Sequence, residues 1–368
     1  MNKALRKIKS QVRAISAYTL TETEHEVKIN QNENPFEIPL ELKEEVLDFA
    51  RKRPWGRYPD FVQTRFAEQL AQHVGWTSEG ILVGNGSNEL IQATLMVAVG
   101  PGTSVVIPTP TFTLYQLLSR ILGADVIEVM LKKSDLTFDV PAIERAISKA
   151  NADLVILCSP NNPTGCVMAP EDVERILRRS DALVVMDEAY QQFSETTCVP
   201  LLMRYENLIV LRTFSKAFSL AGLRIGYLMA WPEVAAEILK AKLPYNLNFF
   251  SQEAAIVTLE HWPIVQKHVE ALKAQRSFVY DRLANMNEVK VYPSQANFLL
   301  FETPFDPKQV FLKLVDRGIL VRDVSRYPML SKALRVSIGT EEENRRFLES
   351  LESVLEELRT GSEETGET

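Results

Sequence analysis

Between residues 80 and 230 the chain repeats one pattern: a short apolar run ends at a glycine, proline or polar residue, and helix-length segments separate several of the runs. Runs of four to seven apolar residues without polar alternation are typical of strands buried on both faces, as in a mostly parallel sheet. The intervening segments have the punctuation of helices, because 87–102 ends in Gly-Pro-Gly and 169–180 begins with proline and acidic residues. The runs are 80–85, 104–109, 125–131, 153–160, 182–190, 208–214 and 225–230. The predicted fold class is therefore α/β.

The sequence pattern changes after residue 250. A long helical pattern at 251–286, interrupted by Pro263, precedes four short strand-like runs and one further helix-like segment. This α+β pattern predicts a second, smaller domain beside the large one. We expect an N-terminal arm at 1–28, a small domain from 29–48 and 256–360, a large domain at 49–255 and a disordered tail at 361–368.

The composition restricts the class of ligand. Lysine and arginine number 41 and aspartate and glutamate 48, a formal net charge of −7, which argues against a nucleic-acid-binding protein. No apolar run approaches the roughly 20 residues of a membrane helix, and the basic N-terminal segment lacks the apolar core of a secretory signal. The three cysteines and four histidines have the spacing of neither a disulfide framework nor a metal site. We expect a cytoplasmic protein that acts on small molecules.

Polar residues follow several of the apolar runs, where ligands bind in open α/β sheets. Gly86, Ser87 and Asn88 stand at the start of a helix, whose free N–H groups suit a phosphate, although an ordinary helix cap explains them equally well. The third glycine of a dinucleotide fingerprint is absent, so this segment predicts a phosphate site at most.

Three later runs end in groups of a different kind. Asn162 follows one of them in a proline-rich turn, Asp187 and Tyr190 follow the next, and Lys216 stands in a small polar loop after the third. Ser215 precedes this lysine and Arg224 follows it by eight residues. Each alone fits a turn, a helix cap or a solvated charge. Together they supply a phosphate anchor, a partner for a ring nitrogen, donors to a phenolate and an amine whose pKa burial would lower, which fits pyridoxal phosphate.

These motifs resemble those of the fold-type-I pyridoxal-phosphate-dependent aminotransferases and, within them, of the histidinol-phosphate aminotransferases. The resemblance covers nearly the whole chain, and its motifs occur in the family's order. They are NENP (32–35), GRYPD (56–60), GNGSNELI (84–91), PTPTFTLY (108–115), SPNNPTG (159–165), DEAY (187–190), RTFSKAFSLAGLRIGY (212–227) and LRVSIGT (334–340).

The resemblance implies a large domain with a mostly parallel sheet, a smaller α+β domain and a role for each matching residue. Lys216 would hold the cofactor as a Schiff base and shuttle the substrate proton, and Asp187 would pair with the pyridinium nitrogen. Tyr190 and Asn162 would donate to the phenolic oxygen, and Phe112 would stack on the ring. The residues that would hold the phosphate are Ser87, Asn88, Ser215 and Arg224.

The resemblance also implies a homodimer and a substrate site. Tyr58 of GRYPD would reach the cofactor from the partner subunit, and Arg335 with Arg322 would bind the substrate's anionic groups. Asn34 of NENP and Tyr18 of the arm would contribute to substrate binding, although the proline that usually precedes this tyrosine is Ala17 here. Arginines paired with local acids would be the structural alternative for Arg322 and Arg335.

The implied reaction converts L-histidinol phosphate and 2-oxoglutarate to 3-(imidazol-4-yl)-2-oxopropyl phosphate and L-glutamate, in histidine biosynthesis. An aromatic amino acid aminotransferase and a phosphothreonine decarboxylase-like enzyme remain alternatives, because relatives of both kinds share this scaffold. A non-catalytic pyridoxal-phosphate-binding module and an α/β binding protein without cofactor are more remote. Assays of purified protein for glutamate-dependent amination, release of carbon dioxide and yellow colour would separate these alternatives.

Overall fold

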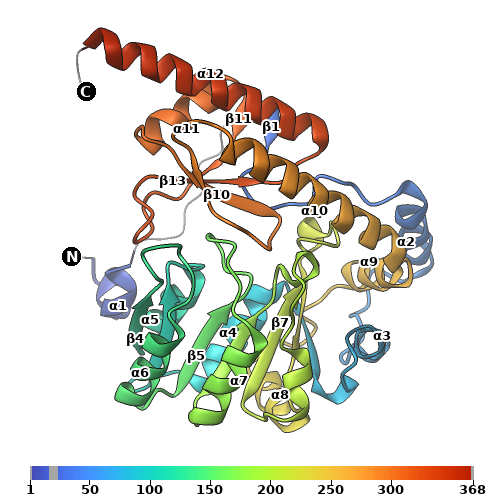
Figure 1. Cartoon of the computed structure of the whole chain (residues 1–368). Helices are drawn as coiled ribbons and strands as arrows, with labels where there is room; N and C mark the ends of the chain where they lie inside the picture. Colours follow the sequence, from blue (N-terminus) through green and yellow to red (C-terminus); the bar gives the residue numbers. More distant parts are fainter. Residues whose placement is uncertain (1, 16–23, 366–368) are drawn as a thin grey trace.

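A sheet of seven strands forms the lower part of the molecule in Figure 1. The computed structural model describes residues 2–15 and 24–365 of the chain. The strands, in the order β2-β8-β7-β6-β5-β3-β4, are parallel except β8, which runs antiparallel to both of its neighbours. They are β2 (Ile81–Asn85), β3 (Ser104–Thr109), β4 (Asp125–Met130), β5 (Leu154–Cys158), β6 (Leu183–Asp187), β7 (Leu208–Thr213) and β8 (Ile225–Met229). The predicted α/β class and mostly parallel sheet are confirmed.

Helices cover both faces of this sheet. In β5, Leu154 and Ile156 pack into one cluster, and Val155 and Leu157 pack into the other, so alternate side chains are buried on opposite faces. One face carries α4 (Ser87–Ala98), α5 (Leu114–Leu122) and α8 (Pro232–Leu239), and the other carries α3 (Thr64–Val74), α6 (Val140–Ala150) and α7 (Pro170–Arg179). Burial on both faces explains why the strands appear in the sequence as continuous apolar runs.

A smaller sheet with long helices lies above the seven-stranded sheet in Figure 1. Its strand order is β12-β13-β10-β9, and β1 pairs in parallel with β11 beside it. The strands are β1 (Val27–Lys28), β9 (Lys290–Val291), β10 (Phe298–Glu302), β11 (Ile319–Leu320), β12 (Arg322–Asp323) and β13 (Ala333–Ser337). The remaining helices are α1 (Ser10–Arg13), α2 (Leu40–Lys52), α9 (Phe249–Glu260), α10 (Trp262–Ala284), α11 (Pro307–Asp316) and α12 (Glu341–Thr365).

Short 3₁₀ turns occur at η1 (Leu5–Lys7), η2 (Ser78–Gly80), η3 (Gln191–Phe193), η4 (Val199–Met203) and η5 (Ala221–Leu223). Among the residues that the structure describes, no helix is both long enough and apolar enough to cross a bilayer.

The expected segment boundaries differ from the elements in three places. The arm was expected to extend to residue 28, but β1 pairs with β11 and so joins the small sheet. The boundaries at 48 and 255 fall inside α2 and α9, which pack against each other. The expected tail begins inside α12, which continues to Thr365. The division into two domains stays a prediction.

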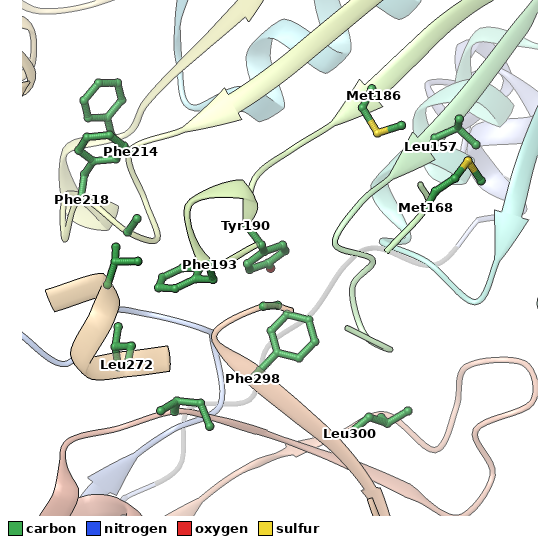
Figure 2. Packing of buried hydrophobic residues seen from close by; sticks show 14 of the residues in the cluster. Leu157, Met168, Met186, Tyr190, Phe193, Phe214, Phe218, Leu272, Phe298 and Leu300 are labelled. Carbon is green, nitrogen blue, oxygen red and sulfur yellow. The ribbon is translucent and has the colours of Figure 1, made fainter. Parts of the chain in front are cut away.

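One apolar core connects the two sheets. Met186 of β6 and Tyr190 after it belong to the same cluster as Phe298 and Leu300 of β10 (Figure 2). The rings of Tyr190 and Phe298 meet edge to face, with centres 5.1 Å apart. The small sheet is therefore fixed directly over the ends of the large sheet's strands, where ligands bind in folds of this class.

Candidate active site

The carboxyl ends of β2, β3, β5, β6 and β7 meet at the edge of the large sheet that faces the small one (Figure 1). A cavity of about 310 Å³ lies at this edge. It brings together most of the residues that the sequence predicted for the site. Its lining includes Ser87, Asn88, Phe112, Asn162, Asp187, Tyr190, Ser215, Lys216, Arg224, Arg322 and Arg335.

Lys216 lies on the loop between β7 and β8. Its Nζ donates a hydrogen bond to the carbonyl oxygen of Gln31 at 2.8 Å and lies 5.9 Å from the centre of the Tyr190 ring. Desolvation in the cavity, together with the positive charges of Arg335 and Arg224, lowers the pKa of Lys216 from 10.5 to about 7. At neutral pH much of Lys216 is therefore an uncharged amine, the form that attacks a carbonyl carbon or accepts a proton.

Asp187 is the last residue of β6 and is 3% exposed. The Tyr115 hydroxyl donates to its Oδ2 at 2.6 Å, and the Ala189 N–H donates to its Oδ1 at 3.0 Å. Burial raises the pKa of Asp187 from 3.8 to about 6, although both hydrogen bonds act in the opposite direction. A carboxylate held this way binds a cationic ring nitrogen well, because the cation offsets the cost of burying its charge.

Tyr190 and Asn162 offer hydrogen-bond donors to the cavity. The Tyr190 oxygen accepts a hydrogen bond from Asn32 Nδ2 at 3.0 Å, and Asn162 Oδ1 accepts one from Arg335 Nη1 at 2.5 Å. Burial raises the pKa of Tyr190, so its hydroxyl keeps its proton. Both side chains thus receive hydrogen bonds from the protein and can donate to a ligand oxygen.

A closely packed anion site lies where β2 enters α4. Gly86 has φ of 78°, and a Cβ there would lie 2.5 Å from Nη2 of Arg224. A Cβ on Gly226 would lie 2.3 Å from the backbone nitrogen of Ser87, the first residue of α4. Arg224 Nη1 donates to Ser215 Oγ at 3.1 Å. A helix N-terminus, hydroxyl groups and a guanidinium gathered in this way suit a phosphate.

The two arginines come from neighbouring strands of the small sheet. Arg322 on β12 is the cross-strand partner of Arg335 on β13. Arg335 is 7% exposed, lies over the ring of Phe298 at 5.2 Å, and donates from Nη2 to the carbonyl oxygen of Asn30 at 2.7 Å. Two guanidinium groups beside an amine can bind the oxyanions of a substrate, phosphate or carboxylate.

Two of the predicted site residues that the structure describes, Asn34 and Tyr58, do not line this cavity. Asn34 uses its Nδ2 to donate to the Ala217 carbonyl at 2.9 Å and its Oδ1 to accept from the Phe36 N–H at 3.0 Å, so it holds the loop that carries Lys216. Tyr58 is 80% exposed and stacks on Tyr245, with ring centres 4.5 Å apart. Tyr18 lies outside the described residues.

The structure also brings in residues to which sequence reasoning gave no role. Tyr115 reaches Asp187, Asn32 reaches Tyr190, and Tyr327 lines the cavity beside Arg322. Tyr115 stands in the PTPTFTLY motif three residues after Phe112, and the two rings meet edge to face with centres 5.5 Å apart. Helical spacing between two aromatic residues was the available signal, but only the structure reveals that the second one bonds to Asp187.

These groups together fit pyridoxal phosphate: an amine for its aldehyde, a buried carboxylate for its ring nitrogen, donors for its phenolic oxygen and a glycine-lined cup for its phosphate. Within residues 2–15 and 24–365, no group of three or more His, Cys, Asp or Glu side chains is arranged to hold a metal ion.

Comparison with known proteins agrees with this geometry. The model of the family "Aminotransferase class I and II" matches residues 24–351. The histidinol-phosphate aminotransferase of Chlorobaculum parvum is 43% identical over 329 residues, which are 89% of this chain and 92% of that protein. The enzyme of the same name from Chlorobaculum tepidum is 41% identical over 90% of this chain and 95% of that protein.

Solved structures share the fold. A putative histidinol-phosphate aminotransferase from Erwinia carotovora atroseptica superposes with a TM-score of 0.84 at 24% identity, over 93% of this chain and 99% of that one. An L-threonine-O-3-phosphate decarboxylase from Porphyromonas gingivalis superposes with a TM-score of 0.79 at 22% identity, over 90% and 99%. The fold alone therefore does not separate a transaminase from a decarboxylase. The sequence relatives, at 43% and 41% identity, are histidinol-phosphate aminotransferases, and this chain belongs to the class I and II aminotransferases and, within them, to the histidinol-phosphate aminotransferases.

Proposed function

We propose that this transaminase transfers the amino group of L-histidinol phosphate to 2-oxoglutarate, giving 3-(imidazol-4-yl)-2-oxopropyl phosphate and L-glutamate in histidine biosynthesis. The names of the sequence relatives support the substrate. One observation of the structure carries the proposal: Lys216, whose pKa is lowered to about 7, shares a cavity with the cross-strand pair of Arg322 and Arg335. An amine beside two guanidinium groups is what amine chemistry on a phosphorylated substrate requires.

The cofactor is pyridoxal 5'-phosphate. When bound, it supplies an aldehyde for amines and a ring that accepts the electron pair released at the substrate Cα. Asp187 would face the ring nitrogen, Phe112 the ring surface, and Tyr190 with Asn162 the phenolic oxygen. The phosphate would lie in the cup formed by Ser87, Asn88, Ser215 and Arg224.

Lys216 has two tasks in this proposal. With the cofactor bound, its uncharged Nζ would hold the cofactor's aldehyde carbon until the substrate amine displaces it, and the freed amine would then take the proton from the substrate Cα as a general base. The lowered pKa supports both tasks, because a lysine with its usual pKa would be almost fully protonated at pH 7. Asp187 holds charge of the opposite sign at the other end of the site and thereby favours the protonated ring nitrogen.

Arg322 and Arg335 would bind the phosphate of histidinol phosphate in one half-reaction and a carboxylate of 2-oxoglutarate or glutamate in the other. A guanidinium fork accepts either anion in a bidentate geometry. Arg335 also donates to Asn162, so the anion site and the donor set for the cofactor share one side chain.

We also propose a homodimer in which Tyr58 reaches the partner's site. The support is an exposed apolar patch around this residue, which a monomer would leave in water. Its members are Trp55 at 76%, Tyr58 at 80%, Phe61 at 62% and Val62 at 64% exposure. A cytoplasmic location is part of the same proposal, supported by three cysteines, Cys158, Cys166 and Cys198, that form no disulfide.

The experiment that tests the function is a panel of single half-reactions. The enzyme loaded with pyridoxal phosphate is mixed separately with histidinol phosphate, phenylalanine, aspartate and phosphothreonine, and the loss of its visible absorbance band is followed. Histidinol phosphate is expected to react with the highest second-order rate constant. A faster reaction with phenylalanine would instead identify an aromatic aminotransferase, and release of carbon dioxide from phosphothreonine would identify a decarboxylase.

A further inference from the structure

Three consecutive residues, Asn30, Gln31 and Asn32, form one wall of the cavity, and each bonds to a different functional group. The carbonyl oxygen of Asn30 accepts from Arg335 at 2.7 Å, and that of Gln31 accepts from Lys216 at 2.8 Å. Asn32 differs from the other two because it uses its side chain, donating from Nδ2 to the Tyr190 oxygen at 3.0 Å. The wall therefore contacts Tyr190 through a side-chain amide, which donates hydrogen bonds from its nitrogen and accepts them at its oxygen.

Asn32 is 1% exposed and held on every side. Its backbone N–H donates to Ser337 Oγ at 2.8 Å, and the Ser337 hydroxyl donates to Asn32 Oδ1 at 3.0 Å. Its carbonyl oxygen accepts from Asn297 Nδ2 at 3.1 Å. Its φ is 54°, a left-handed conformation that asparagine adopts more readily than most residues. The position and the hydrogen bonding of this side chain are fully specified.

These contacts set the direction of each bond. A backbone N–H can only donate, so Ser337 Oγ accepts from Asn32 N, and the Ser337 hydroxyl is free to donate its hydrogen bond to Asn32 Oδ1. That leaves Nδ2 of Asn32 to face Tyr190, whose oxygen receives the amide hydrogen. The single proton of the Tyr190 hydroxyl then points away from Asn32. If the amide of Asn32 were reversed, Tyr190 would have to donate to Asn32 instead.

We propose that Asn32 is a positioning residue, held by Ser337 of the small sheet, that turns the Tyr190 hydroxyl proton into the cavity toward the phenolic oxygen of the cofactor. This inference rests on the proposed role of Tyr190 as a donor to that oxygen. Asn162 is oriented in a similar way. Its Oδ1 accepts a hydrogen bond from Arg335 Nη1, so its amide hydrogens remain available to donate into the cavity.

Several other groups act on Tyr190 and must be kept constant in any test. The edge of the Phe298 ring packs against it, the charged groups that influence it are Arg335 and Asp187, and the Cys158 thiol lies nearby. Lys216 Nζ lies 5.9 Å from its ring. A comparison of variants with and without the Tyr190 hydroxyl cancels these contributions, because the surrounding groups are the same in both.

The measurement is the pKa of the visible chromophore in the loaded enzyme, obtained from the absorbance as a function of pH. Donors to the phenolic oxygen stabilise its anionic form and hold this pKa down, so losing a donor raises it. Asn32→Asp keeps the shape of the side chain and its bond to Ser337, but a carboxylate can only accept, which turns the Tyr190 proton away from the cofactor.

A double-mutant cycle with Tyr190→Phe separates the effect of the direction of the Tyr190 hydrogen bond from the effect of the negative charge that Asn32→Asp adds. The added carboxylate raises the chromophore pKa in both backgrounds, and we expect the rise to be larger, by roughly 0.5 to 1 pH unit, where Tyr190 is present. Ser337→Ala removes only the hydroxyl that orients Asn32 and should give a smaller shift that also depends on Tyr190. Asn344→Ala is the matched control, because Asn344 on α12 is also buried but bonds to Gly339 and Gln275 instead.

The outcomes separate the inference from the function on which it rests. Equal shifts in the two backgrounds would overturn the role of Asn32 and leave Tyr190 as the donor. No shift on Tyr190→Phe itself would overturn the donor role of Tyr190 and, with it, the role of Asn32, while the half-reaction panel would still report on the substrate. If Asn32→Asp does not fold, the Ser337→Ala cycle decides the question in the same way.

Discussion

Lys216 acquires its chemistry from its surroundings. Desolvation and the positive charge of Arg335 lower its pKa to about 7, whereas a lysine on the protein surface would titrate near 10.5. Arg335 lies on the small sheet and Lys216 on a loop of the large one, so the reactivity of one amine depends on both parts of the chain.

This dependence predicts how the protein without cofactor captures pyridoxal phosphate. The rate constant should rise with pH through about 7, because only uncharged Lys216 reacts, and then level off. Arg335→Gln removes a positive charge from the cavity, so the pKa of Lys216 should rise and the midpoint should move to higher pH. Stopped-flow absorbance measures both profiles, and the ionisations of the free cofactor are common to the two proteins. Identical midpoints would contradict the charge argument.

In the protein without cofactor, burial of the negative charge of Asp187 lowers the free energy of unfolding. Its pKa in the folded state is about 6 and in an unfolded chain about 3.9, so between these values the folded state binds more protons and stability falls as pH rises. Above pH 6 the full cost of roughly 2 to 3 kcal/mol is present. Asp187→Asn should therefore unfold at a higher temperature than the wild type at pH 8 and lose this advantage near pH 4, while transamination is lost.

Differential scanning calorimetry of the two proteins without cofactor, at both pH values, checks this expectation. A variant less stable than the wild type at pH 8 would indicate that the Tyr115 bond to Asp187 outweighs the burial of its charge.

The sequence predicted the site residues that lie at or just after strand ends, because the end of an apolar run can be read from the sequence alone. Asp187, Lys216 and Asn162 are of this kind, and all three line one cavity. The sequence did not predict the contacts of Asn32 or Tyr115, since each reaches its partner across 158 or 72 residues. Asn34 is the opposite case. Its motif suggested a role in substrate binding, but its side chain donates a hydrogen bond to the Ala217 carbonyl.

At the scale of elements, the turn from β2 into α4 is the part of the site that leaves the least room for an added side chain. Gly86 has φ of 78° and faces Arg224, and a Cβ at this position would lie only 2.5 Å from Nη2. Gly75, at the end of α3, has nearly the same φ, 72°, but a Cβ there would meet nothing within 4 Å. The pair separates the effect of backbone strain from the effect of crowding the phosphate cup.

Gly86→Ala is expected to weaken the binding of pyridoxal phosphate at least about tenfold, because displacing Arg224 removes a charge-assisted hydrogen bond to the phosphate. Gly75→Ala should lower the melting temperature through its strained backbone and leave this affinity unchanged. Fluorescence titration with pyridoxal phosphate gives the two dissociation constants. Equal loss of affinity in both variants would assign the effect to strain alone.

The elements of the large sheet could be predicted well because strands buried on both faces leave continuous apolar runs. What the runs do not reveal is direction: β8 lies between β2 and β7 but runs opposite to both. The helices α2 and α9 cross the domain boundaries that the change in sequence pattern predicted. The two helices pack against each other, and no change in composition marks this contact in the sequence.

At the scale of the whole molecule, the exposed aromatic patch and the cavity are separate on a single chain. Tyr58 is 80% exposed and does not line the cavity that holds Lys216. If Tyr58 completes the partner's site, two inactive variants should restore each other. In a mixed dimer of Tyr58→Ala and Lys216→Ala, one site carries both changes and the other carries neither.

Mixing the two variants under conditions that exchange subunits should therefore restore transamination, up to one intact site in each mixed dimer. Each variant mixed with itself is the control. Activity that stays at the sum of the separate variants would show that Tyr58 acts within its own subunit or not at all. Sedimentation measurements of all three samples establish whether dimers are present.

The order in which the chain is synthesised gives the wall of residues 30–32 a further consequence. The large sheet is complete once Met229 has been made, yet Arg335 and Ser337, which fasten this wall, are synthesised more than a hundred residues later. A partly synthesised chain can form the side of the cavity that the large sheet supplies but not the side that the small sheet supplies. The groups that would hold the cofactor are made before residue 230, but the Arg335 contact to Asn30 and the Ser337 contact that orients Asn32 can form only after residue 337 has been made, so the complete site should appear late.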